Sequence, residues 1–126
     1  MKLQYLADGS PDCPLIRLYD FQPSEAERLK ELFDSLANGS RTSALLHEQT
    51  GIESVDACHL DLRLGTRDVG IAQKGLLAFE CTLTREGWSE VASLVEPFCA
   101  AAKAETHQWL TQDGKISLLI SPSGRW

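Results

Sequence analysis

The stretch LLAFECTLTREGWSEVASLVEPFCAAA, residues 76–102, carries the clearest pattern in this chain. Its first part alternates between apolar and polar side chains, which is the period of a strand with one buried face. The apolar set is Leu77, Phe79, Cys81 and Leu83, and the polar set is Glu80, Thr82 and Thr84. The pattern predicts a strand whose apolar side belongs to the core.

The second part of this stretch changes to the period of a helix. Thr84 offers a side-chain oxygen to the free amides of the helix start, and Glu86 suits the positive end of the helix dipole. Pro97 removes a backbone hydrogen bond, so we expect the helix to break or kink near Glu96, with residues 98–102 forming a turn or a helical continuation. The predicted apolar stripe consists of Trp88, Val91, Ala92 and Val95. A strand that leads directly into a helix must bury both apolar faces together, so this unit is expected to form half of the core.

A second helix is predicted earlier in the chain, and two starting points fit its sequence. Pro23 suits the first helical position, where its missing amide costs nothing. Alternatively, Ser24 caps the helix and Glu27 completes a capping box three residues later. Asn38 and Gly39 provide the left-handed stop. The buried stripe of this helix is predicted to be Ala26, Leu29, Leu32, Phe33 and Leu36.

Runs rich in β-forming residues predict further strands, separated by turn residues. The turn-rich segments 8–12 and 65–68 are expected to be loops, and residues 106–121 are expected to form a hairpin. The predicted strands cover residues 2–6, 14–21, 41–48, 55–64, 69–73, 106–111 and 115–121.

The two predicted helices share an apolar pattern at a shift of 62 residues. Leu29, Leu32, Phe33 and Leu36 align with Val91, Leu94, Val95 and Phe98. Sequence identity across the shift is low, so duplication and convergent patterning both remain open. The predicted fold is a single α+β domain over residues 1–126: a mostly antiparallel sheet of six to eight strands with two helices on one face, with two similar βαββ units as an option.

Composition excludes several classes of function. The chain has 12 Lys and Arg against 18 Asp and Glu, a net charge of −6, and its basic residues are scattered. Binding to nucleic acid or to an anionic membrane needs a positive field, so neither partner is expected. The apolar runs are too short to cross a bilayer, and no export signal is recognised, so a cytoplasmic protein is expected.

The four cysteines predict reduced thiols without a metal. Cys13, Cys58, Cys81 and Cys99 form no closely spaced pair, whereas structural zinc sites use two tight ligand pairs. Cys58 and His59 are neighbours on a predicted strand and therefore point to opposite faces. Neither a metal nor a cofactor is expected, since phosphate-binding glycine loops and serine nucleophile motifs are also missing from the sequence.

One polar constellation is a candidate site. His59, Asp61 and Arg63 project from one face of a predicted strand, and Glu80 projects from the polar face of another. A histidine held by a carboxylate can act as a general base, provided that the two strands are neighbours. The competing interpretation is a solvated sheet face with cross-strand charge pairs.

The functional expectation is a non-enzymatic binding or regulatory module that works through protein–protein contacts as a homodimer. The alternative is a small enzyme or small-molecule binder that uses His59, Asp61 and Glu80. The terminal Trp126 either packs on its own domain or marks an interface with a second copy.

Overall fold

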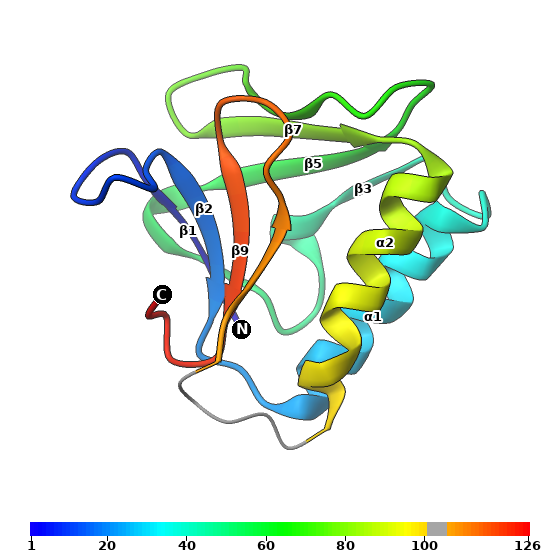
Figure 1. The fold of residues 1–126 in the computed structure, drawn as a ribbon, viewed down its shortest axis with the longest axis horizontal. Helices are drawn as coiled ribbons and strands as arrows, with labels where there is room; N and C mark the ends of the chain where they lie inside the picture. The colour runs from blue at the N-terminus through cyan, green and yellow to red at the C-terminus, as the bar shows by residue number, and fades with distance from the viewer. Residues whose placement is uncertain (101–105) are drawn as a thin grey trace.

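The computed structural model describes residues 1–100 and 106–126, and within these residues nine strands form two sheets beside two α-helices (Figure 1). The five-stranded sheet has the order β4 (Glu53–Ser54), β1 (Lys2–Leu6), β2 (Leu15–Tyr19), β9 (Ser117–Ser121) and β8 (Gln108–Thr111). The four-stranded sheet has the order β3 (Ser43–Leu45), β5 (His59–Leu64), β7 (Ala78–Leu83) and β6 (Gly70–Gln73).

The α+β class and the two predicted helices are confirmed, but the single, mostly antiparallel sheet is wrong. Both sheets are mixed, because β1 pairs in parallel with β4, β2 with β9, and β5 with β7. A period of two in the sequence shows which side chains share a face, but it contains no information on the direction or identity of the neighbouring strand.

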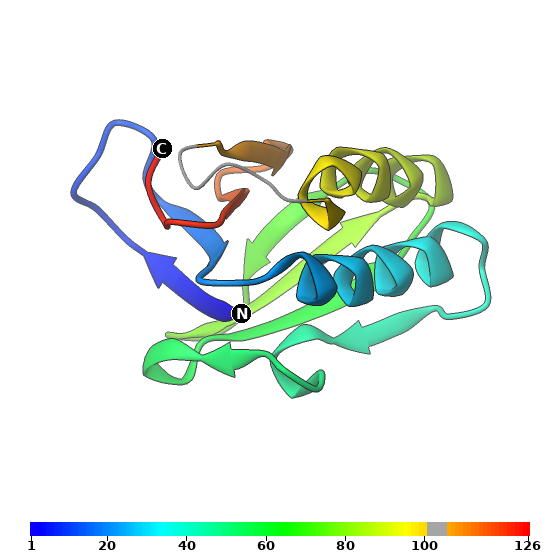
Figure 2. The ribbon, with the colours of Figure 1, turned by 90° about the horizontal axis from the view of Figure 1, so that it is seen from below.

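The core fills the space enclosed by the two sheets and the helix pair. The strands of the two sheets cross one another, and the helices lie along the remaining side (Figures 1 and 2). Phe33 of one helix stacks on Trp88 of the other, with ring centroids 5.5 Å apart. The predicted apolar stripes of both helices and the inward residues of β7 all belong to this cluster: Ala26, Leu29, Leu32, Phe33, Leu36, Phe79, Cys81, Leu83, Trp88, Val91, Ala92 and Val95.

The first helix, α1 (Pro23–Ala37), begins as the proline interpretation predicts. Pro23 occupies the first helical position, and the amide of Gln22 donates to the Glu25 carboxylate at 3.0 Å, so the alternative cap at Ser24 is wrong. The helix ends at Asn38 and Gly39, whose φ of 78° is the left-handed conformation that the sequence predicts.

The second helix, α2 (Arg85–Val95), begins and ends as predicted. Thr84 Oγ1 accepts a hydrogen bond from the amide of Gly87 at 3.1 Å. Regular α-helix stops before Glu96, and a 3₁₀ turn, η3 (Glu96–Cys99), contains Pro97. Of the predicted continuation, residues 101 and 102 lie outside the described residues.

In two of the predicted strands, part of the segment forms a 3₁₀ turn instead. Of residues 41–48, only β3 is extended, and it is followed by the 3₁₀ turn η1 (Leu46–Glu48). Of residues 55–64, the first three form the 3₁₀ turn η2 (Val55–Ala57), in which Asp56 and Ala57 have φ values of 54° and 58°. These left-handed residues turn the chain from β4 into β5, which a strand pattern does not reveal.

The order strand, helix, strand, strand occurs twice, if the two-residue β4 is set aside. The elements are β2, α1, β3 and β5 in the first half and β7, α2, β8 and β9 in the second. The last strand of each half pairs in parallel with the first strand of the other, and each half also has an antiparallel strand before this order, β1 on β2 and β6 on β7. The halves are therefore interlocked through both sheets.

The C-terminal tail packs on its own chain, against the outer face of the five-stranded sheet. Trp126 Nε1 donates to Asp12 Oδ2 at 3.0 Å, and Arg17 Nη1 donates to the Gly124 carbonyl at 2.7 Å. The Arg17 guanidinium also lies over the Tyr19 ring, 4.0 Å from its centroid. The interpretation of Trp126 as a latch within one molecule is thus the one the structure supports.

Candidate functional site

The outer face of the four-stranded sheet gathers the residues that the sequence singles out. His59 and Asp61 of β5 lie beside Ala78 and Glu80 of β7, because the two strands pair in parallel in this register. Together they line a shallow hollow of about 270 Å³. We call it the sheet-face hollow, and its lining residues are Leu45, His47, His59, Asp61, Lys74, Ala78, Phe79 and Glu80.

Two stacked histidine rings form one side of the sheet-face hollow. The rings of His47 and His59 have centroids 4.2 Å apart and are inclined by only 3°. The amide of Leu60 donates to His47 Nδ1 at 3.0 Å. His47 is thereby fixed by the β5 backbone, and it supports the exposed ring of His59.

The two carboxylates of the hollow are joined to one arginine. Asp61 and Glu80 occupy directly opposite positions on paired strands, where like charges repel. Arg63 offsets this repulsion: its Nη2 lies 2.9 Å from Asp61 Oδ2, and its Nε lies 3.1 Å from Glu80 Oε2. The group is a cross-strand ion triad on a solvated face.

The His59 ring is not paired with a carboxylate in this arrangement. Within the described part of the chain, no carboxylate forms a hydrogen bond with the His59 ring, whose contact is the stack on His47. Both acids that the sequence suggests as partners turn to Arg63 instead. For His59 to act as a general base oriented by an acid, Asp61 or Glu80 would have to leave Arg63 and turn to the ring.

Sequence reasoning did not find Leu45, His47 or Lys74. The sequence pattern of residues 41–48 predicts one strand. In the structure, the 3₁₀ turn η1 brings the His47 ring to the backbone of β5, where it contacts the Leu60 amide. Lys74 belongs to the connection between β6 and β7 and meets β5 only through tertiary pairing. No local pattern marks either residue, because their proximity depends on which strands become neighbours.

The cysteines lie away from this face as free thiols. Burial raises the pKa of Cys58 to about 11 and that of Cys81 to about 12, so neither is a thiolate at neutral pH. Among residues 1–100 and 106–126, no three His, Cys, Asp or Glu side chains are arranged to hold a metal ion. In the same residues, no helix has the length and apolar character needed to cross a membrane.

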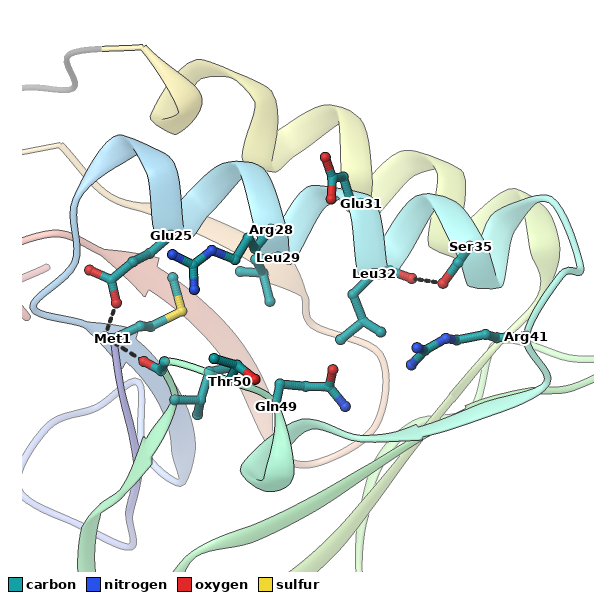
Figure 3. Close-up of a pocket in the computed structure, with 12 residues that line it drawn as sticks. Met1, Glu25, Arg28, Leu29, Glu31, Leu32, Ser35, Arg41, Gln49 and Thr50 are labelled. Atoms are coloured by element: carbon teal, nitrogen blue, oxygen red, sulfur yellow. Dashed lines mark hydrogen bonds and ion pairs between the residues drawn. The ribbon is translucent and has the colours of Figure 1, made fainter.

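A second hollow lies between α1 and residues 49–52, with a volume of about 310 Å³ (Figure 3). We call it the helix–loop cavity. Leu29 and Leu32 of α1 form its apolar side, and Gln49 and Thr50 face them from the loop (Figure 3). Its remaining lining residues are Met1, Glu25, Arg28, Glu31, Ser35, Arg41, Gly51 and Ile52.

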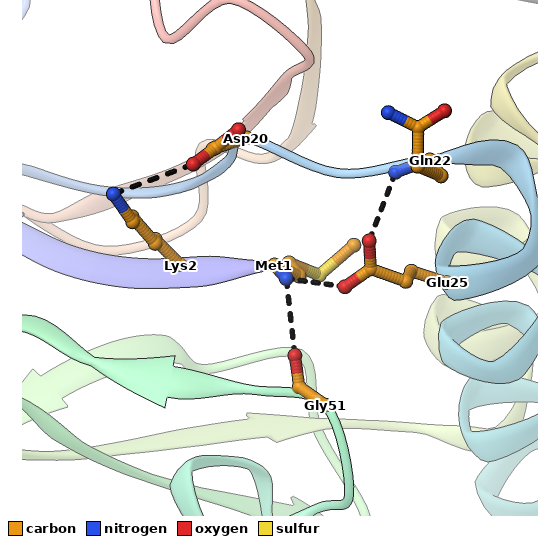
Figure 4. A network of polar contacts seen from close by, with 6 residues as sticks. All are labelled: Met1, Lys2, Asp20, Gln22, Glu25 and Gly51. Atoms are coloured by element: carbon orange, nitrogen blue, oxygen red, sulfur yellow. Dashed lines mark hydrogen bonds and ion pairs between the residues drawn. The ribbon is translucent and has the colours of Figure 1, made fainter.

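One end of the helix–loop cavity is closed by a polar network (Figure 4). The N-terminal ammonium of Met1 donates to Glu25 and to the Gly51 carbonyl, the latter at 3.0 Å. Partial burial of Glu25 opposes its ionisation, but the hydrogen bonds from the ammonium and from the Gln22 amide prevail and lower the pKa of this carboxyl group. Beside this network, Lys2 pairs with Asp20 at 3.3 Å.

Comparisons of the chain with protein-family models, with curated proteins and with solved structures found no match. The functional conclusion therefore depends on the geometry of the two hollows.

Proposed function

We propose that this protein is a non-enzymatic binding module that forms a homodimer through the outer face of its four-stranded sheet. The observation that carries the proposal is the composition of this face: an exposed leucine beside stacked histidines and a balanced set of charges. Leu45 is 39% exposed at the edge of the sheet-face hollow, and the opposite sheet already has its outer face in contact with the C-terminal tail.

Charge balance supports a second copy as the occupant. The face presents two acids, Asp61 and Glu80, and two bases, Arg63 and Lys74, so these four residues sum to zero. The whole chain carries −6. Two copies approaching through this face therefore bring together their neutral surfaces, while the repelling negative charges stay farther apart. A closed dimer also needs a self-complementary patch, and a patch with both signs of charge meets that need.

The test is sedimentation velocity of the full chain at micromolar concentrations, with Leu45→Asp as the variant. The added carboxylate would be buried without a partner in the dimer, so we expect the dimer to dissociate at least about tenfold more readily. Val69→Asp is the matched control, because Val69 is 47% exposed in the loop between β5 and β6, away from the sheet-face hollow.

Salt provides a second readout. Raising ionic strength screens the repulsion between two chains of charge −6, so dimerisation should be unchanged or stronger in salt. A strict monomer at all concentrations, or equal effects of Leu45→Asp and Val69→Asp, would contradict the proposed dimer.

The convergence of His59, Asp61 and Glu80 supports the alternative of a small-molecule binder, or a small enzyme, at the same face. One variant distinguishes a small-molecule site from a dimer interface at this face. His59→Ala removes the exposed ring of the pair, which would abolish binding of a small ligand in the hollow but only weaken an extended protein interface.

A further inference from the structure

The helix–loop cavity combines an apolar seat with two arginines. Arg28 comes from the middle of α1 and Arg41 from the segment before β3, and their guanidinium groups approach the space from opposite ends, with Leu29 and Leu32 between them (Figure 3). Its volume of about 310 Å³ is at the lower end of the range for ligand pockets.

Both arginines are exposed side chains that line the cavity. Arg28 reaches across the cavity, because its Nη1 would lie 3.3 Å from a Cβ atom placed on Gly51, and its charge acts on Glu25. In the described part of the chain, neither guanidinium forms a hydrogen bond or ion pair.

The acids that line the cavity do not pair with Arg41. Glu25 is held by the N-terminal ammonium and the Gln22 amide. Glu31 points to the side of α1 away from residues 49–52 (Figure 3). A guanidinium that lines a cavity without an acid of its own has donors free for an anion from solution, and its planar fork matches a carboxylate.

We propose that the helix–loop cavity binds a small organic carboxylate, with Arg41 as its anchor and Leu29 and Leu32 as the seat of its apolar part. Gln49 and Thr50 supply polar groups opposite the leucines, and Arg28 closes the other end. This site lies on a different surface from the sheet-face hollow, so it does not depend on the proposed dimer.

The probe is 3-phenylpropionate, titrated into ¹⁵N-labelled full-length protein and followed by amide chemical shifts. We expect saturable shifts centred on residues 49–52 and on α1. The neutral analogue 3-phenylpropanamide has the same apolar body without the charge and should bind at least about tenfold more weakly, as expected for the loss of a charge-assisted hydrogen bond.

Two variants test the assignment of residues. Arg41→Gln should weaken 3-phenylpropionate binding by about tenfold or more, whereas Arg67→Gln, which removes the same charge from the exposed β5–β6 loop, should leave it unchanged. Thr50→Trp keeps both arginines and places a large ring at the cavity, so it should also abolish binding.

Several results would overturn the proposal. These are the absence of saturable shifts, equal effects of Arg41→Gln and Arg67→Gln, or equal binding of the amide. Binding of inorganic phosphate at the same site with similar affinity would also overturn it, because it would show that the apolar seat plays no part.

Discussion

The two halves of the chain, residues 2–64 and 70–121, share one order of elements but differ in their connections, among them the one between their last two strands. In the first half, 13 residues (46–58) separate β3 from β5, and they include η1, β4 and η2. In the second half, only residues 112–116 separate β8 from β9. In both halves the connection returns to the first strand: β4 pairs with β1, and Ile116 forms a bridge with Ile71 of β6.

The longer connection supplies residues to both hollows. His47 belongs to the sheet-face hollow, and residues 49–52 form the loop side of the helix–loop cavity. The comparison teaches that the repeated elements supply the walls of both hollows, and that the longer connection of the first half completes each of them.

The largest expected effect tests an asymmetry between the helices. At the shift of 62, Trp88 of α2 corresponds to Ala26 of α1, and both are fully buried. Trp88 also links the halves, since its Nε1 donates to the Arg63 carbonyl at 3.0 Å and its ring stacks on Phe33. Trp88→Ala should lower the free energy of unfolding by about 4 kcal/mol, and Ala26→Gly by only about 1 kcal/mol.

Urea unfolding followed by far-ultraviolet circular dichroism measures both losses. Trp88→Phe separates the two roles of the indole: it keeps most of the packing and should cost about 1 to 2 kcal/mol through the lost hydrogen bond. If Trp88→Ala proved no more harmful than Ala26→Gly, the halves would not depend on this side chain for their packing.

The next effect concerns the short connection of the second half. Gly70 has a φ of +80°, and a Cβ atom there would lie 2.0 Å from the Asp113 carbonyl oxygen. Gly9, in the β1–β2 loop, has a φ of +101° but no atom within 4 Å of such a Cβ. Gly70→Ala should therefore cost about 3 kcal/mol, combining backbone strain with overpacking, while Gly9→Ala should cost about 1 kcal/mol from strain alone.

Thermal unfolding of the two glycine variants checks this difference under identical conditions. Similar losses of stability in the two variants would show that residues 112–116 can shift to accommodate a Cβ atom at Gly70. The contact between Gly70 and Asp113 would then not hold the turn rigidly in place.

The smallest effect distinguishes the starts of the helices. Thr84 caps α2, and its hydroxyl also donates to Asp68. At the start of α1, the Glu25 carboxylate accepts hydrogen bonds from the N-terminal ammonium and from the Gln22 amide. The folded-state pKa of Glu25 is lowered, so its stabilising contribution is complete above the ordinary value of 4.5 and is lost as the pH falls through the folded value.

Glu25→Gln should accordingly cost about 1 kcal/mol at pH 7 and progressively less in acid. Denaturant unfolding at a series of pH values measures the gap between variant and parent. Glu27→Gln, on the exposed side of the same helix, is the control and should show no such gap. A gap for Glu25→Gln that persists unchanged at pH 3 would show that the ionic contact does not stabilise the helix start.

Local patterns predicted the elements well where side-chain periodicity and capping act within a few residues. The strand β7, the cap at Thr84 and the break at Pro97 all follow from neighbours in sequence. For the first helix, the sequence left two starts open, and the contact between Gln22 and Glu25 decided between them.

The candidate site was partly predictable for the same reason. The period of two placed His59, Asp61 and Glu80 on polar faces, but only the parallel pairing of β5 with β7 made them neighbours. His47 could not be found, because its position depends on a 3₁₀ turn that the strand-like pattern of residues 41–48 conceals.

By itself, the sequence determined the α+β class, the two helices with their buried stripes, and the net charge of −6. Only the tertiary structure decided that there are two mixed sheets, that the halves exchange strands, and that Trp126 latches onto Asp12. The physical reason is range: hydrophobic periodicity and caps are short-range properties of the chain, whereas strand direction and the neighbours of a side chain are settled by contacts between residues far apart in sequence.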